Sequence, residues 1–76
     1  TTLKYEMGSA GPVSIDVFDV NGRKIRSLYN GIQIPGQHEI RWDAKDDHGR
    51  SMSSGVYLFK VNVNGKQQTA KSLLLK

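Results

Sequence analysis

The sequence contains no cysteine, only two prolines and no long apolar run. Without thiols the chain has neither a disulfide framework nor a thiolate metal cluster, so packing and backbone pairing must hold it together. No stretch approaches the about 18 apolar residues of a membrane helix, and the first residues lack the regions of a signal peptide. With 76 residues, we expect a single domain over 1–76, because a chain of this size builds one small core. The chain starts directly on strand-like sequence, so we further expect it to be a domain of a longer protein.

Acidic residues are missing from the last part of the chain. The 11 Lys and Arg residues exceed the 7 Asp and Glu residues, which gives a net charge of +4. Residues 1–55 are balanced, and the excess lies in 56–76, which carries Lys60, Lys66, Lys71 and Lys76. A local excess of this kind indicates a binding surface on the terminal segment rather than general affinity for polyanions.

Apolar residues alternate with polar ones nearly everywhere, and helical spacing is not sustained. Strand signals cover residues 3–7, 13–17, 38–42, 56–63 and 66–76, and the strongest is that of 56–63. Between them, Asn30-Gly31 and Pro35-Gly36 are expected to bracket a loop, and residues 43–50 a turn-rich connection. Six to seven short strands at this spacing predict an all-β fold, an antiparallel two-sheet β-sandwich.

Two Asn-Gly pairs predict two-residue hairpin turns, because both positions of a type I′ turn take positive φ. At Asn21-Gly22 this register places Val20 opposite Arg23, Asp19 opposite Lys24, Phe18 opposite Ile25 and Ile15 opposite Leu28. At Asn64-Gly65 it places Val63 opposite Lys66, Phe59 opposite Ala70, Leu58 opposite Lys71, Tyr57 opposite Ser72 and Val56 opposite Leu73. The second hairpin then has apolar residues on both faces, which favours a partner or a covering segment on one of them.

The polar residues do not form a local catalytic signature. His38, His48, Ser53 and Ser54 are of the types found in hydrolytic triads, but no motif brings them together. Asp43, Asp46 and Asp47 offer oxygen ligands for calcium, yet their spacing does not match the helical calcium loop, and we favour a structural turn. We therefore expect no catalytic residue, no metal and no cofactor, and leave calcium binding at this loop open.

Aromatic residues do not interleave with basic ones, which argues against nucleic acid as a partner. Trp42 has two interpretations. A sandwich of this size needs a large side chain in its core, so a buried indole is favoured over an exposed platform that stacks on sugars.

Several motifs resemble a known family pattern. Residues 13–23 resemble the hairpin V-x-I-x-I-Y-D-x-x-G-R, residues 35–43 resemble A-G-x-H-x-V-x-W-D, and residues 47–57 resemble D-x-x-G-x-x-x-x-S-G-V-Y. With the terminal residues 71–76, the chain is similar to C-terminal sorting domains of type IX secretion (type A) and to the related immunoglobulin-like domain of flagellar hook-capping proteins. The resemblance implies an immunoglobulin-like sandwich whose scaffold residues are Arg23, Gly36, Trp42, Asp43, Asp47, Gly49, Ser54, Gly55 and Tyr57.

The resemblance leads us to expect a non-catalytic sorting domain, the C-terminal domain of a longer exported protein, which directs this parent protein through the outer membrane. The recognition signal would be Lys71, Ser72, Leu73, Leu74, Leu75 and Lys76. Its partners would be the secretion machinery and the parent's N-terminal domains, and its location the cell surface or the medium of a Gram-negative-type bacterium. One alternative is an assembly domain as in hook-capping proteins. A weaker alternative is an accessory carbohydrate-binding module of an exported enzyme.

Overall fold

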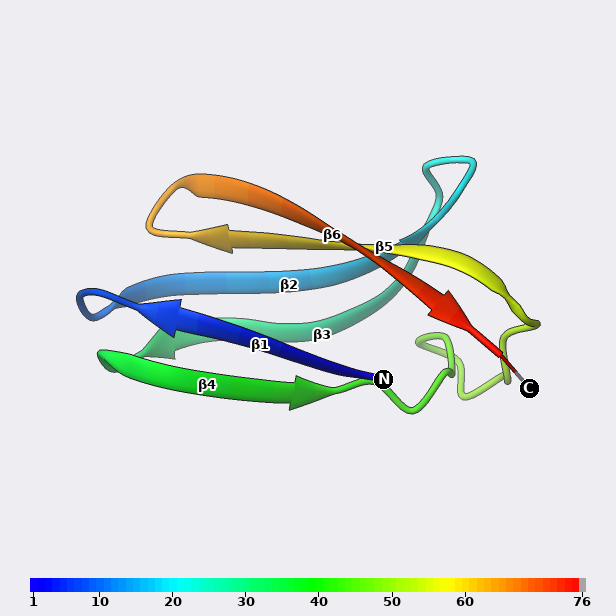
Figure 1. Cartoon of the computed structure of the whole chain (residues 1–76), viewed down its shortest axis with the longest axis horizontal. Coiled ribbons are helices and arrows are strands. Elements are labelled where there is room, and N and C mark those ends of the chain that lie inside the picture. The colour runs from blue at the N-terminus through cyan, green and yellow to red at the C-terminus, as the bar shows by residue number, and fades with distance from the viewer. Residues whose placement is uncertain (76) are drawn as a thin grey trace.

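A computed structural model describes residues 1–75 as six antiparallel strands in two layers (Figure 1). The strands are β1 (Thr2–Met7), β2 (Gly11–Asp19), β3 (Lys24–Gln33), β4 (Gly36–Arg41), β5 (Gly55–Val63) and β6 (Lys66–Leu74). One sheet has the order β1-β4 and the other the order β3-β2-β5-β6. The molecule measures 36 × 21 × 20 Å. Across residues 1–75 no helix is long and apolar enough to cross a membrane.

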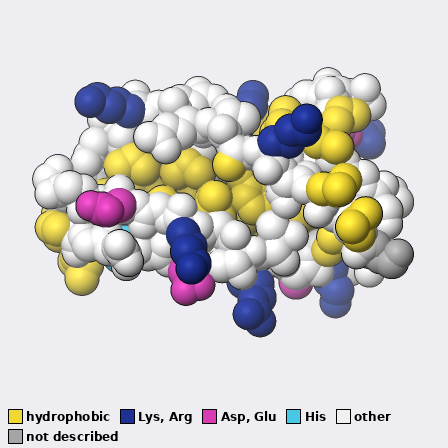
Figure 2. Space-filling view, viewed as in Figure 1, with side chains coloured by type: hydrophobic (Ala, Val, Ile, Leu, Met, Phe, Trp, Pro, Cys, Tyr) yellow, Lys and Arg dark blue, Asp and Glu magenta, His cyan; other side chains and the backbone are white. Residues whose placement is uncertain are grey.

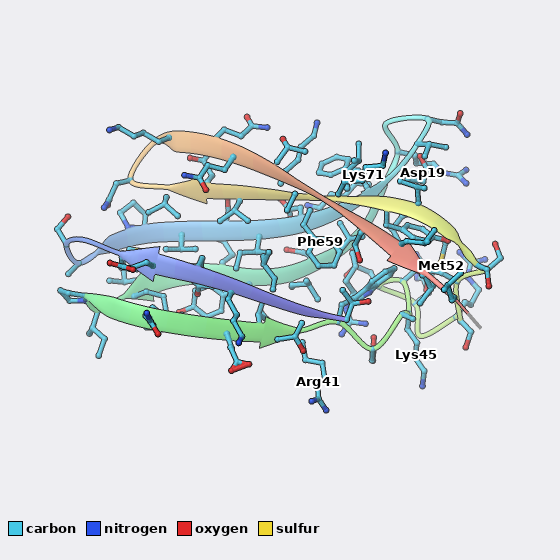
Figure 3. All side chains as sticks on the ribbon, in the orientation of Figure 1. Asp19, Arg41, Lys45, Met52, Phe59 and Lys71 are labelled. Carbon is cyan, nitrogen blue, oxygen red and sulfur yellow. The ribbon has the colours of Figure 1, made fainter. Side chains whose placement is uncertain are left out.

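The core lies between the two sheets, where alternate strand residues point inward. Val13, Ile15 and Val17 of β2 are at most 1% exposed, and Phe59 at the centre of β5 is 2% exposed. Figure 3 shows Phe59 between the layers, whereas Arg41 projects away from β4. The prediction of an all-β, immunoglobulin-like sandwich is confirmed, because period-two burial on several strands leaves two facing sheets as the way to close the core.

The turn at Asn21-Gly22 differs from the predicted two-residue turn. Gly22 has a φ of +84° while Asn21 is not among the residues with positive φ. The Asp19 amide donates to the Arg23 carbonyl at 2.9 Å and the Gly22 amide to the Asp19 carbonyl at 3.1 Å. This is a three-residue turn with glycine at the left-handed position.

The predicted register of this hairpin is therefore wrong. The structure pairs Phe18 with Lys24 and Ile15 with Tyr29, with irregularities after Ile15 and Val17. The cause is the Asp19 carboxylate, whose Oδ1 accepts hydrogen bonds from the amides of Asn21 at 3.0 Å and Arg23 at 2.9 Å. These bonds favour a turn that the dipeptide by itself does not indicate.

The expected loop between Asn30-Gly31 and Pro35-Gly36 is also largely wrong. Strand β3 continues through Asn30 and Gly31 to Gln33, because Gly31 pairs with Val13 and Gln33 pairs with Gly11 of β2. A partner strand that supplies backbone hydrogen bonds thus overrides a local turn signal.

The hairpin at Asn64-Gly65 is confirmed. Both residues have positive φ, +50° and +83°. The register pairs Val63 with Lys66 and continues to Gly55 opposite Leu74, so all the predicted pairs are present.

Candidate functional site

The connection between β4 and β5 is held together by the Asp46 side chain. Its Oδ1 accepts hydrogen bonds from the amides of His48 and Arg50, both at 2.9 Å, and its Oδ2 accepts one from Arg50 Nε at 3.0 Å. These bonds lower the pKa of the Asp46 carboxyl, the amide of Arg50 contributing most. Gly49, with a φ of +80°, closes the turn by donating to the Asp46 carbonyl at 3.0 Å.

Arg26 of β3 attaches this connection to the four-stranded sheet. Its Nη1 donates to Asp43 Oδ1 at 3.0 Å and to the Lys45 carbonyl at 3.2 Å. Next to it, Asp47 Oδ1 accepts from the Ser27 amide at 3.1 Å. The sequence alone does not single out Arg26, because no local signal in β3 points to its partners. The Asp46-to-Arg50 spacing could have indicated the turn.

Trp42 lies just after β4 in the core, 2% exposed. Its indole Nε1 donates to the Lys45 carbonyl at 2.9 Å, and its ring meets Tyr57 and Phe59 edge-on with centroids 5.1 and 5.8 Å away. The Tyr57 hydroxyl in turn donates to the Ser53 carbonyl at 2.7 Å. A buried indole is unable to serve as a sugar-stacking platform, so Trp42 does not support the carbohydrate-binding interpretation.

The remaining candidates for chemistry lie apart. His38 stacks on Tyr5 with centroids 5.4 Å apart, and its Nε2 lies 2.8 Å from the Ile34 carbonyl oxygen. His48 lies in the connection between β4 and β5. Among residues 1–75, no three His, Cys, Asp or Glu side chains are grouped so as to hold a metal ion.

The scaffold residues of the predicted motif are brought together only in part. Five of them lie in or against the connection between β4 and β5, namely Trp42, Asp43, Asp47, Gly49 and Tyr57. Arg23 lies at the first turn, where its Nε is 3.5 Å from Asp19 Oδ2. Gly36 opens β4, Gly55 opens β5 and Ser54 precedes it on the surface.

Of the predicted recognition residues 71–76, residues 71–74 belong to β6 and alternate between its two faces. Leu74 packs against the core, and Ser72 lies opposite the buried Tyr57. Leu73 and Leu75 point outward and are 61% and 77% exposed. Lys76 lies outside the described residues.

An apolar surface covers the outer side of the last hairpin and its neighbour β2. We call this surface the terminal face and define it by Phe18, Val56, Leu58, Leu73 and Leu75. Phe18 pairs with Leu58, and Val56 pairs with Leu73, so these four side chains adjoin across three strands, and Leu75 follows directly after β6. Lysines border the face: Lys60 Nζ lies 4.4 Å from the Phe18 ring centroid, and Lys71 pairs with Leu58.

The two-layer antiparallel sandwich places the chain in the class of immunoglobulin-like β-sandwich domains. The sequence profile of the FlgD Ig-like domain matches residues 2–67, and the chain belongs to this family. The crystal structure of FlgD from P. aeruginosa is similar to the chain with a TM-score of 0.73 and 26% identity, and the match covers 96% of the chain. The chain matches 58% of that FlgD chain. No curated protein matches it.

The interpretation of the chain as a type IX sorting signal is therefore wrong, because the matching family is the FlgD Ig-like domain. The two families share the hairpins and turns that build one sandwich, so the motifs that carried the resemblance specify the fold and not the function. The expected role of residues 71–76, the partners and the cellular location stay predictions.

Proposed function

We propose that the chain is a non-catalytic assembly domain of a FlgD-type flagellar hook protein, and that it packs against copies of its own chain through the terminal face. Membership of the FlgD Ig-like family supports the assembly role. The similarity to a solved FlgD chain over 96% of this chain supports it as well.

The exposure of the terminal face carries the proposal. Monomeric proteins rarely leave adjoining large apolar side chains in water without a partner. Leu73 of β6 and Leu75, which directly follows that strand, are 61% and 77% exposed. Full burial of one leucine side chain contributes about 1.5–3 kcal/mol, so a contact that covers both provides a substantial part of a weak subunit interface.

The geometry of the face also suits packing between subunits. Four of its five side chains, all but Leu75, stand on the hydrogen-bonded strands β2, β5 and β6, so these four are held in place before association. A preorganised surface loses little conformational entropy when it binds.

Sedimentation of the purified domain over a wide range of concentrations tests this function. We expect reversible association that Leu73→Ser with Leu75→Ser weakens by at least about tenfold, because about 1.4 kcal/mol of contact energy corresponds to one decade. The matched control is Ile32→Ser with Ile34→Ser, since these residues are 68% and 69% exposed but lie outside the terminal face. A domain that stays monomeric up to millimolar concentration, or an equal effect of both pairs, contradicts the proposal.

A further inference from the structure

The two sheets leave an open groove on the side of β1 and β6. The four-stranded sheet extends to β6, whereas the two-stranded sheet ends at β1. The groove has a volume of about 440 Å³ and is lined by residues of both strands and of β5. Its apolar lining consists of Leu3, Tyr5, Val61, Val63 and Ala70. Figure 2 shows an elongated yellow strip of hydrophobic side chains in the hollow between the two layers.

The backbone of β1 has free hydrogen-bonding groups along this groove. The Trp42 amide donates to the Thr1 carbonyl at 2.9 Å, and the Thr1 amino group to the Trp42 carbonyl at 3.5 Å. The register is unbroken from Thr2 opposite Arg41 to Met7 opposite Gly36. Because hydrogen-bonded and non-hydrogen-bonded pairs alternate in an antiparallel ladder, the N–H and C=O groups of Thr2, Lys4 and Glu6 point away from β4.

We infer that this groove binds one extended segment of a partner protein, which adds to β1 as a third strand of the small sheet. Its backbone would pair with Thr2, Lys4 and Glu6, and its alternate side chains would enter the groove. Strand addition of this kind combines main-chain hydrogen bonds with pockets for every second side chain. The site is separate from the terminal face, which lies on the outer side of β5 and β6.

The charges at the groove indicate the chemistry of that segment. Its charged lining residues are Lys4, Glu6 and Lys66, an excess of one positive charge, and β5 and β6 carry no acidic residue. An acidic side chain on the solvent side of the added strand would lie beside Lys4, and opposite charges across a strand pair attract. The partner segment is therefore apolar at alternate positions, with an aspartate or glutamate between them.

A second folded copy does not fit this position as well as a single strand. Antiparallel pairing of β1 with β1 of a second copy relates the two chains by a two-fold axis perpendicular to the two-stranded sheet. The four-stranded sheets of both copies then lie on the same side of the joined small sheets, in a common layer. Since β6 already extends past β1 in that layer, the two large sheets would overlap (Figure 1). An extended segment meets no such obstacle.

The size of the groove favours side chains of moderate volume. The segment would rest on Val61, Val63 and Ala70, none of which is larger than valine. Valine also fits an extended backbone, because its branched side chain suits the pleated sheet. A suitable probe is the capped heptapeptide Ser-Val-Asp-Val-Thr-Val-Ser.

NMR titration of the isotope-labelled domain with this peptide tests the inference. We expect shifts of the Val61 and Ala70 methyl signals and slower exchange of the Lys4 and Glu6 amides. Lys4→Pro should weaken binding by at least about tenfold, because it removes a free N–H without touching the bonds to β4. The matched control is Glu39→Pro on the opposite edge of the same sheet, which should leave binding unchanged.

Further variants keep the test decisive if Lys4→Pro disturbs the fold. Ala70→Trp fills the groove without altering the β1 backbone and should abolish binding, and a peptide with lysine in place of aspartate should bind more weakly. The inference is overturned if millimolar peptide leaves the groove methyl signals unmoved or if Lys4→Pro binds as well as the unmodified domain. If the Lys4 and Glu6 amides become protected from exchange as the protein concentration rises, with no peptide added, the groove binds a second copy of the chain and not a peptide segment.

Discussion

Single polar side chains connect parts of this small domain that the sheets leave apart. Asp46 accepts three hydrogen bonds within its own turn, and Arg26 joins that turn to β3 through Asp43 Oδ1 and the Lys45 carbonyl. Trp42 adds a bond from its indole to the same carbonyl. The connection between β4 and β5 therefore has a defined conformation although it contains little regular structure.

The lowered pKa of Asp46 predicts a loss of stability in acid. A carboxyl whose folded pKa lies below its unfolded value of about 3.9 contributes stability above that value and loses it as the pH falls through the folded pKa. We expect the free energy of unfolding to fall between about pH 5 and pH 2, and Asp46→Asn to reduce the size of that fall. Urea unfolding at several pH values measures both. An unchanged pH profile in Asp46→Asn would show that other groups cause the acid sensitivity.

At the scale of elements, the two Asn-Gly hairpins show that one dipeptide supports two turns. At Asn64-Gly65 both residues take positive φ and the turn has two residues. At Asn21-Gly22 the Asp19 carboxylate binds the amides of Asn21 and Arg23, and the turn has three. The difference arises from a side chain two residues before the pair, so the dipeptide predicts a turn but not its register.

Replacing Gly65 tests the importance of the second turn. Its φ of +83° is a conformation that costs an L-residue about 1–2 kcal/mol, so Gly65→Ala should destabilise the domain by about 1 kcal/mol. Gly8→Ala is the matched control, because an added Cβ at Gly8 meets no atom within 4 Å and its φ is not in that region. It should be neutral or slightly stabilising. Equal denaturation midpoints in urea for the two variants would mean that the type I′ geometry contributes nothing.

At the scale of the whole molecule, charge and apolar surface coincide on the terminal hairpin. Residues 1–55 are neutral overall, and the excess positive charge follows in residues 56–76. Lys60 and Lys71 border the terminal face, while Lys66 lies at the groove beside β1. The hairpin thus contributes to two surfaces that both carry positive charge: the first is the apolar terminal face, and the second is the open groove beside β1.

Salt should affect the two surfaces in opposite directions. Packing of two terminal faces brings lysines of both copies together, so raising the ionic strength from about 0.01 M to 0.1 M should strengthen self-association by screening their repulsion. Binding of the acidic heptapeptide in the groove should weaken over the same range. Sedimentation and NMR titration at the two ionic strengths measure the effects. Self-association that weakens with salt would contradict packing between like-charged faces and favour an acidic partner surface.

The sequence by itself determined the features that depend on neighbouring residues. Period-two alternation specified most of the strands and the sandwich, although not the end of β3. The pair Asn64-Gly65 specified a hairpin with its full register, and the need for a large core residue placed Trp42 inside. These follow from backbone sterics and side-chain direction, which act over a few residues.

Only the tertiary structure decided the features that depend on which strands become neighbours. The pairing of β2 with the end of β3 turned a predicted loop into a strand, and the contact of Arg26 with Asp43 joined residues 17 positions apart. The unequal sizes of the two sheets opened the groove between β1 and β6. Local patterns do not encode such distant pairings, because each depends on the whole set of strands that competes for the same backbone hydrogen bonds.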